Sequence, residues 1–310
     1  MPGKPYLGGV VNIKRRVMGL LALFFIIAFV SGTAWIIREK EEKKPLHYLR
    51  KNNWAQITED VFVFSGDGSE NMTLIISGKD ATIIDTGAMP WDSDVKRGVN
   101  KLMETIEKKK LRVKNIIYTH YDRDHTSNTA LFTRNEPRGS VNMYCPYSTE
   151  YGQLIKMGDK TFRVIDTYGH AAICGGHISI ELVKENILVS GDVLYTNFIP
   201  CMRPGDSPKA YIETLEKIKK AKYAMIIPGH GNILNPDYTV ERSLKYLYTL
   251  KKKSEKMLRD GASLADLRRS IKLKDCFKDA EGVNLQDSIQ TEFHRSNIRQ
   301  FYAELKGEPI

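Results

Sequence analysis

Short apolar segments separated by turn residues occupy the first half of the folded region and predict strands. Three of them come in quick succession: Val61 to Phe64, Asn71 to Ile76 and Ala81 to Ile84. Runs of this length between turn residues are typical of strands. Apolar side chains then recur at helical spacing from Val95 to Ile106, which predicts a helix. The apolar stretch from Val113 to Tyr118 follows and predicts a buried strand.

The same order of elements returns further along the chain. Strands are predicted at residues 162–166, 178–182, 187–189 and 223–227, with a helix around Tyr211 to Ile218 before the last of them. Beyond Pro236 the pattern becomes helical, with helices predicted at residues 240–258, 263–271 and 289–305. We therefore expect an α/β (α+β) domain over residues 53–236 and a helical extension over residues 237–310.

An uncharged apolar segment lies near the N-terminus, from Val17 to Ile37. As a helix it reaches about 30 Å, enough to cross the hydrocarbon core of a bilayer. Small residues at Gly32-Thr33-Ala34 leave a cleaved signal peptide as the alternative. Because the apolar segment continues through Ile37, we expect residues 1–37 to be an uncleaved membrane anchor and residues 38–52 to be a charged linker.

The net charge of +10 is concentrated beside this segment. Residues 1–51 hold ten Lys and Arg against three Glu, an excess of +7, so residues 52–310 carry only +3. Basic residues next to a span favour contact with anionic lipids, whereas a nucleic-acid partner is not expected without a basic groove. The flanking charges do not settle the orientation, but an anchor before one large domain predicts a single-pass membrane protein with an exported domain, on the periplasmic or extracellular side.

Cysteine usage adds little to this picture. The chain has four cysteines, at positions 145, 174, 201 and 276, and no CxxC pair. They are too few for a disulfide scaffold in a chain of this length, so buried thiols are expected, or one disulfide if the domain is exported.

The densest group of potential metal ligands directly follows the strand predicted at Val113 to Tyr118. The segment from Thr119 to His125 contains His120, Asp122, Asp124 and His125. Alternate side chains of a loop converge on one point, and the adjacent Asp124 and His125 can face a second point. Imidazole and carboxylate ligands together suit divalent ions of intermediate hardness. The segment therefore predicts a metal site, with a polar surface loop as the alternative.

Three later residues complete a recognisable order. His170 follows one predicted strand, Asp192 lies in Ser190-Gly191-Asp192, and His230 lies in Pro228-Gly229-His230-Gly231. With Ile83-Ile84-Asp85-Thr86-Gly87 before them, these motifs resemble the HxHxDH loop, later His, GD pair and PGH motif of the metallo-β-lactamase superfamily. The resemblance covers about residues 61–232, and the tail helices resemble the C-terminal extension of glyoxalase II-like bacterial members.

This resemblance implies a four-layer αββα sandwich, with an N-terminal transmembrane helix and a C-terminal helical extension added in this chain. It implies two divalent metal ions, zinc with manganese or iron as alternatives. One ion is expected at His120, Asp122 and His170, and the other at Asp124, His125 and His230, with Asp192 bridging both. A metal-bridging hydroxide is the implied nucleophile, which Asp124 orients.

Two departures from the family pattern affect these expectations. Asp122 stands where the family has a second His, as in HxDxDH variants that resemble phosphodiester-cleaving branches, and a carboxylate there favours manganese or iron. The segment from Gly169 to His177 carries two extra residues relative to the family's HTxGH pattern. His170 aligns with the ligand and His177 with a packing His, while the reverse assignment stays open.

Other polar residues have weaker claims. Tyr195, Asn197 and Arg203 follow Asp192, where substrate contacts are expected, although a solvated surface arginine is the preferred interpretation of Arg203. His294 is expected to pack or cap a helix. The basic runs at residues 108–110 and 251–253 are expected to be solvated helix faces, and His47 is assigned no role.

The expected function is that of a metal-dependent hydrolase acting on an ester, thioester or lactone-like bond of a small molecule. The alternative, favoured by Asp122, is a phosphodiesterase or nuclease. An alternative of another class is a membrane-anchored binding protein with a vestigial metal site, which the intact set of seven ligands disfavours. The sequence defines neither the substrate nor the oligomeric state.

Overall fold

The computed structural model describes residues 46, 49, 53–66, 70–89, 93–170, 175–277 and 283–309. The chain divides into two units, Met1–Lys44 and Pro45–Ile310, and every described residue belongs to the second. The predicted anchor, most of the predicted linker, His47 and Cys174 lie outside the described residues. Within the described part of the chain, no helix combines the length and the apolar character needed to cross a membrane.

The first sheet contains six strands that pair in chain order: β1 (Trp54–Gln56), β2 (Val61–Ser65), β3 (Asn71–Ser77), β4 (Asp80–Ile84), β5 (Arg112–Ile117) and β6 (Asn142–Tyr144). Strands β1 to β4 are antiparallel, and β4, β5 and β6 are parallel. The helix α3 (Ser93–Lys109) makes the crossover between β4 and β5. Two short helices, α4 (Arg123–Thr126) and α5 (Thr129–Thr133), lie between β5 and β6.

The second sheet contains five strands: β7 (Leu154–Met157), β8 (Lys160–Asp166), β9 (Ile178–Leu182), β10 (Ile187–Tyr195) and β11 (Met225–His230). Its spatial order is β11-β10-β9-β8-β7. Neighbouring strands are antiparallel except for β10 and β11, which run parallel and are connected by α6 (Pro208–Ala221). The C-terminal helices follow: α7 (Pro236–Arg259), α8 (Leu264–Ser270), α9 (Leu273–Cys276) and α10 (Ser288–Lys306).

Strand β2 shows how the layers form. All five of its residues are buried because both faces of the sheet are covered. Val61 and Val63 belong to the cluster between the two sheets, whereas Phe62 and Phe64 belong to the cluster beneath α3. Alternate side chains of a strand point to opposite faces, so one apolar run supplies two cores. A Cβ on Gly98 of α3 would lie 2.5 Å from the Ser65 carbonyl oxygen, which shows how closely that helix packs.

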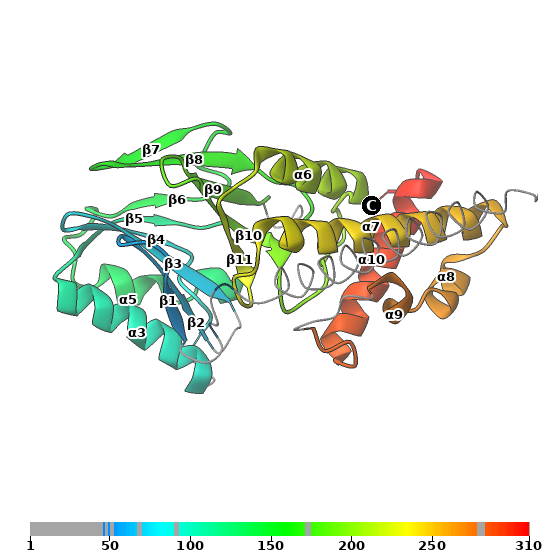
Figure 1. Ribbon diagram of the computed structural model, residues 1–310, viewed down its shortest axis with the longest axis horizontal. Helices are drawn as coiled ribbons and strands as arrows, with labels where there is room; N and C mark the ends of the chain where they lie inside the picture. The colour runs from blue at the N-terminus through cyan, green and yellow to red at the C-terminus, as the bar shows by residue number, and fades with distance from the viewer. Residues whose placement is uncertain are drawn as a thin grey trace, which may run out of the picture. The chain divides into compact units, whose positions relative to one another are not determined.

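A third cluster covers the outer face of the second sheet. Leu188 and Val193 of β10 pack there with Tyr211 of α6, Leu247 of α7 and Phe301 of α10. Helices therefore cover the outer face of each sheet, as Figure 1 shows for α3 and α5 on one side and α6 and α7 on the other. The predicted αββα sandwich is confirmed, and the predicted helical extension is present as α7 to α10.

Local sequence signals set the starts of α6, α7 and α8. The side chain of Ser207 caps α6 and that of Asn235 caps α7, each followed by a proline in the first turn. Ser263 and Asp266 form a reciprocal capping box at the start of α8. These capping hydrogen bonds fix the residue at which each helix begins.

The packed unit begins upstream of β1. Leu49 is fully buried, and its backbone N–H donates to Asn232 Oδ1 at 2.8 Å. The Leu46 N–H donates to the Ile233 carbonyl at 2.7 Å. The end of the predicted linker is therefore in contact with the segment that follows β11.

Candidate metal centre

The loop after β5 supplies four of the seven predicted ligands. Strand β5 is buried at its C-terminal end and delivers the chain to His120, whose side chain is fully buried. Asp122 is the N-cap residue of α4, and this helix carries Asp124 and His125. The short helix turns the chain within this segment, so His125 points back into the interior while the Asp124 side chain stays 39% exposed.

The other three predicted ligands come from the second sheet. His170 lies in the loop after β8 and is 2% exposed. Asp192 lies within β10 at a register shift of its pairing with β11, and His230 is the last residue of β11. Gly191 has a φ of +53°, and a Cβ on Gly229 would lie 2.0 Å from Asp192 Oδ1. Gly229 therefore leaves room for the Asp192 carboxylate, whereas Gly191 leaves room for the His177 and Thr119 side chains, because its own Cβ would lie 2.5 Å from His177 Nε2.

The first group of candidate ligand atoms consists of His120, Asp122, His170 and Asp192. His120 Nε2 lies 3.4 Å from Asp122 Oδ2 and 3.6 Å from Asp192 Oδ2. His170 Nε2 lies 3.5 Å and 3.7 Å from the same two oxygens. Ligand atoms about 2.1 Å from a shared tetrahedral cation are about 3.4 Å apart, so the spacing suits one cation.

The second group consists of Asp124, His125, Asp192 and His230. His230 Nε2 lies 3.2 Å from Asp124 Oδ2 and 3.4 Å from Asp192 Oδ1. His125 Nε2 lies 3.3 Å from Asp192 Oδ1. Asp192 thus presents Oδ2 to the first group and Oδ1 to the second, which is the arrangement of a bridging carboxylate.

Unpartnered polar atoms point into these groups. His120 Nε2, His170 Nε2 and Asp192 Oδ1 are buried and have no hydrogen-bond partner among the described residues. Buried polar atoms are normally satisfied, so three orphans at one place call for a ligand. Four imidazoles and three carboxylates are a donor set that suits divalent metals such as zinc, manganese or iron. The residues present therefore fit a pair of cations.

The electrostatics of the two groups agree with this assignment. Burial would raise the pKa of Asp192, but the neighbouring His230, His125 and His120 hold it well below its usual range. Burial would lower the pKa of His230, but Asp192 and Asp124 raise it to about 10. The carboxylates thus hold a proton on His230, and divalent cations would take over this positive charge.

Residues outside the two groups fix the imidazole rings. Asp85 Oδ2 lies 2.9 Å from His125 Nδ1, and Thr119 donates to Asp85 from both its backbone N–H and its hydroxyl at 2.8 Å. The Cys201 carbonyl lies 3.2 Å from His170 Nδ1. Such partners set the tautomer and orientation of a metal-binding His. The sequence motif identified Asp85 as a family residue, but its contact with His125 Nδ1 was not predicted.

His177 occupies a different environment from His170. His177 Nε2 accepts from the Asp192 backbone N–H at 3.0 Å, and its Nδ1 lies 2.7 Å from Thr167 Oγ1. Both ring nitrogens are therefore used within the protein, whereas His170 Nε2 is free to bind a ligand. The geometry favours the predicted assignment of His170 as the ligand and His177 as a packing residue.

Arg203 corrects one sequence-based expectation. It was expected to be a solvated surface arginine, or else a contact for an anionic substrate group. Instead its guanidinium pairs with both oxygens of Asp122, with Nη1 2.7 Å from Oδ1. Burial opposes the charged form of Asp122, but the nearby His120, His170 and Arg203 hold its pKa well below its usual range. The unusual carboxylate of the first group therefore has a cationic partner of its own.

Two further residues predicted to contact substrate lie inside the protein. Tyr195 is 4% exposed, and its hydroxyl donates to Asp192 Oδ2 at 3.1 Å. Asn197 is 8% exposed, and its carbonyl accepts from Gln290 of α10. Tyr195 therefore holds the carboxylate of the predicted metal ligand Asp192. Neither Tyr195 nor Asn197 is exposed enough to form a surface that contacts substrate. His294 packs as predicted, between the Tyr246 hydroxyl and the Ile271 carbonyl.

Comparison with known families agrees with the fold and the ligand order. Residues 65–137 and 131–230 match the family described as the metallo-beta-lactamase superfamily, and together they cover more than half of the chain. The chain therefore belongs to the metallo-β-lactamase superfamily. The prediction of a metallo-β-lactamase-fold enzyme is confirmed at the level of this superfamily.

Curated relatives carry names of two kinds. Thioesterase pkgB of Emericella nidulans is 27% identical over 190 residues, which are 59% of this chain and 52% of that protein. Atrochrysone carboxyl ACP thioesterase AgnL7 of Paecilomyces divaricatus is 24% identical, over 58% of each chain. Beta-lactamase-like protein 2 homolog of Drosophila melanogaster is 25% identical, over 53% of this chain and 59% of that protein. The chain thus spans between half and three fifths of the length of these relatives.

Solved structures share the fold at low sequence identity. A beta-lactamase domain protein from Burkholderia ambifaria superposes with a TM-score of 0.55 at 17% identity, covering 82% of this chain and 88% of that chain. The sec-alkylsulfatase Pisa1 from Pseudomonas sp. gives a TM-score of 0.57 at 12% identity, covering 81% of this chain and 50% of that chain. At these identities the likeness extends to the fold alone.

Proposed function

We propose that this protein is a dinuclear metal-dependent hydrolase that cleaves a thioester or a related acyl ester. The observation that carries the proposal is the position of Asp192, whose two oxygens face two different groups of ligand atoms. His120, Asp122 and His170 would hold one cation, and Asp124, His125 and His230 the other. A bound pair of divalent cations supplies Lewis acidity, which lowers the pKa of water toward neutrality and stabilises negative charge developing on oxygen.

The residues of the chain have separate tasks in this proposal. Asp124 has the most exposed side chain of the seven predicted ligands. Its carboxylate is therefore placed to orient a water molecule against the acyl carbon. Asp85 and Tyr195 hold His125 and Asp192 in place. Burial raises the pKa of the nearby Cys201 thiol to about 12, which makes this cysteine a poor nucleophile and favours water as the attacking group.

The preference for a thioester comes from two relatives whose names contain "thioesterase". Esters, thioesters and lactones share the same chemical demand, which is attack on an acyl carbon with charge developing on its oxygen. The chain's own geometry supports hydrolysis of this class, and the relatives favour the thioester within it.

A substrate panel tests the proposal. The purified protein is loaded with zinc or manganese and assayed with an acyl thioester, p-nitrophenyl acetate, bis-p-nitrophenyl phosphate and nitrocefin. We expect thioester hydrolysis that chelation abolishes and metal restores, with a loss of at least a hundredfold in Asp124→Asn. Metal-loaded protein that leaves both acyl substrates intact would refute the proposed reaction.

Phosphodiester hydrolysis is the second candidate, and Asp122 is the observation that favours it. A carboxylate at this position makes the first group harder, which suits manganese. The modest charge of +3 over residues 52–310 disfavours a long nucleic acid as its substrate. Rapid cleavage of bis-p-nitrophenyl phosphate with inert acyl substrates would place this candidate first.

A further inference from the structure

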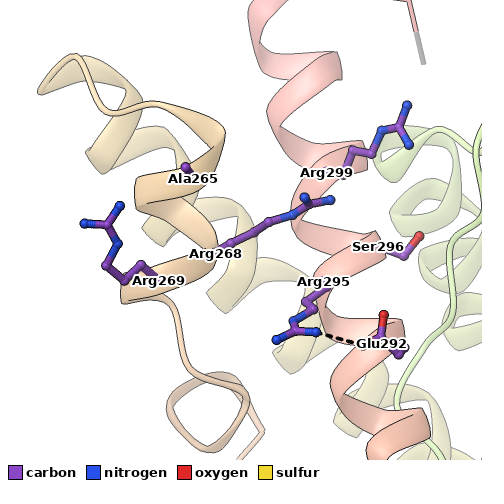
Figure 2. A pocket seen from close by; sticks show the side chains of 7 residues that line it. All are labelled: Ala265, Arg268, Arg269, Glu292, Arg295, Ser296 and Arg299. Atoms are coloured by element: carbon purple, nitrogen blue, oxygen red, sulfur yellow. Dashed lines mark hydrogen bonds and ion pairs between the residues drawn. The ribbon is translucent and has the colours of Figure 1, made fainter.

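A cleft lies between α8 and α10, in the C-terminal helical extension. It has a volume of about 620 Å³, within the range of about 300–1,000 Å³ typical of small-molecule sites. Four arginines line it together with Glu292 and Ser296: Arg268, Arg269, Arg295 and Arg299. Figure 2 shows Arg268 reaching from α8 toward α10, where Arg295 and Arg299 lie, while Arg269 points away.

The positive charges of this cleft are only partly balanced. Arg295 pairs with Glu292 at 2.8 Å, and Arg269 lies 3.6 Å from Asp266. Within the described part of the chain, Arg268 and Arg299 form no ion pair. Two unpaired guanidinium groups that approach one space from different helices repel one another unless an anion lies between them.

The chemistry of the lining selects the class of anion. The planar guanidinium group matches phosphate oxygens with two parallel hydrogen bonds, and arginine is favoured wherever phosphate is recognised in this way. Ser296 lies on the same wall, but its hydroxyl proton is donated to the Met202 carbonyl, so the arginines are the donors that face the cleft. A volume of this size holds more than a single ion, so the ligand is a molecule that carries a phosphate group.

The cleft borders the loop that leads to the metal centre. The Ser296 hydroxyl donates to the Met202 carbonyl at 2.5 Å, and Asn297 Oδ1 accepts from the Met202 N–H at 2.8 Å. The next residue, Arg203, pairs with Asp122 of the first ligand group. A ligand in the cleft would therefore contact the helix that fixes this loop.

We propose that the cleft between α8 and α10 binds a phosphate-bearing small molecule. The phosphate belongs either to the substrate, as the distal end of a phosphorylated thioester, or to a separate effector. The first source rests on the proposed thioester function, whereas the existence of the site does not.

Binding is tested by calorimetry on the metal-loaded protein with inorganic phosphate and with coenzyme A as probes. In Arg268→Gln/Arg299→Gln we expect affinity to fall about tenfold or more relative to Lys252→Gln/Arg259→Gln, which removes the same charge from α7. Ala265→Glu places a carboxylate in the cleft and is expected to weaken binding as well. Equal affinities in the two double variants would overturn the proposal, because the metal centre and the net charge are the same in both.

Kinetics then distinguish the two sources. If the phosphate belongs to the substrate, Arg268→Gln/Arg299→Gln raises KM for an acyl coenzyme A about tenfold with kcat unchanged, and leaves the phosphate-free acyl N-acetylcysteamine thioester unaffected. If it belongs to an effector, added phosphate changes hydrolysis of the phosphate-free thioester in the wild type and not in this variant. Absence of all thioester hydrolysis would count against the proposed function, while calorimetry still decides whether the site exists.

Discussion

At the scale of single residues, Asp85 influences the candidate metal centre without belonging to either ligand group. It adopts a φ of +60°, which is uncommon for a residue other than glycine and is tolerated by Asp. This conformation places its carboxylate against His125 Nδ1, with Thr119 donating to it twice. The left-handed backbone conformation of Asp85 thereby fixes the orientation of the His125 imidazole.

We expect Asp85→Asn to weaken metal binding at the second group about 10–100-fold, the range typical of such partners. The amide cannot accept from His125 and Thr119 as a carboxylate does, so the ring loses its fixed tautomer. Competition against a metal-buffering chelator measures the affinity, with Asp237→Asn on the surface of α7 as the control. An affinity unchanged from the wild type would contradict the role given to Asp85.

His170 and His177 make a matched pair for a second test. We expect His170→Ala to lose the ion of the first group, because its unpartnered Nε2 points at Asp122 and Asp192. His177→Ala should retain both ions but melt at a lower temperature, because it leaves the Asp192 N–H without its acceptor. Metal content and melting temperature are measured on both variants. Loss of metal in the His177 variant alone would reverse the assignment.

The sequence identifies ligands more readily than their partners. The motifs that follow apolar strands contain His120, His125 and His230. The chemical type of each ligand and its place at the end of a strand could therefore be inferred together from the sequence. The Arg203–Asp122 pair spans 81 positions in the chain, and no local pattern encodes it. A lone arginine after Asp192 fits a solvated surface as well as an ion pair with a distant carboxylate, which is why its partner emerged only from the fold.

At the scale of elements, α10 supports the loop between β10 and α6. Asn297 is fully buried, donates to the Pro200 carbonyl at 2.6 Å and accepts from the Met202 N–H at 2.8 Å.

We expect Asn297→Ala to destabilise the protein by about 1–3 kcal/mol, the penalty for leaving buried backbone groups unpaired. It should also lower kcat/KM, because the loop carries Arg203. Urea unfolding and thioester assays check this, with the exposed Thr291→Ala as the control; wild-type values for both would contradict it.

Lys160 connects β8 to two turns. It is 5% exposed and pairs with Glu185 at 2.8 Å and Asp60 at 3.0 Å. Burial would lower the pKa of Lys160, but these carboxylates raise it above its usual 10.5. The stability gained from its charge is therefore complete below pH 10.5 and is lost as the pH rises through the higher value of the folded state.

We expect Lys160→Met to cost about 1–3 kcal/mol at pH 7, because hydrogen bonds to charged groups contribute this much. The difference from the wild type should persist at pH 9 and shrink above pH 10.5. Urea unfolding at several pH values measures it, and Lys156→Met on the exposed side of β7 serves as the control. A difference of the same size at pH 11 as at pH 7 would show that packing, not charge, is responsible.

Long apolar strands and amphipathic helices were the elements that the sequence predicted best. Strands β2 to β5 and helices α6, α7 and α10 lie close to their predicted positions. The three-residue strands β1 and β6 were missed because their side chains are largely exposed and show no alternation. Strand β10 runs on to Tyr195 beyond the predicted Val189, because Gly191 and Asp192 interrupt the apolar pattern but not the strand.

At the scale of the whole molecule, the candidate site depends on how the two sheets meet. The first sheet contributes His120, Asp122, Asp124 and His125 from the end of β5, and the second contributes His170, Asp192 and His230. The apolar cluster between the sheets holds Ile117 of β5 against Val189 of β10 and Ile227 of β11. Sequence motifs alone could name the seven residues, but only the packing of the sheets brings them within one site.

Counting bound metal tests this account most directly. We expect elemental analysis of the purified, metal-loaded protein to give two divalent ions per chain, falling to one or fewer in Asp192→Ala, which removes the oxygens facing both groups. Circular dichroism on the same samples controls for folding. A folded wild-type protein that retains no divalent metal, or an Asp192→Ala variant that still binds two ions as tightly, would contradict the central claim.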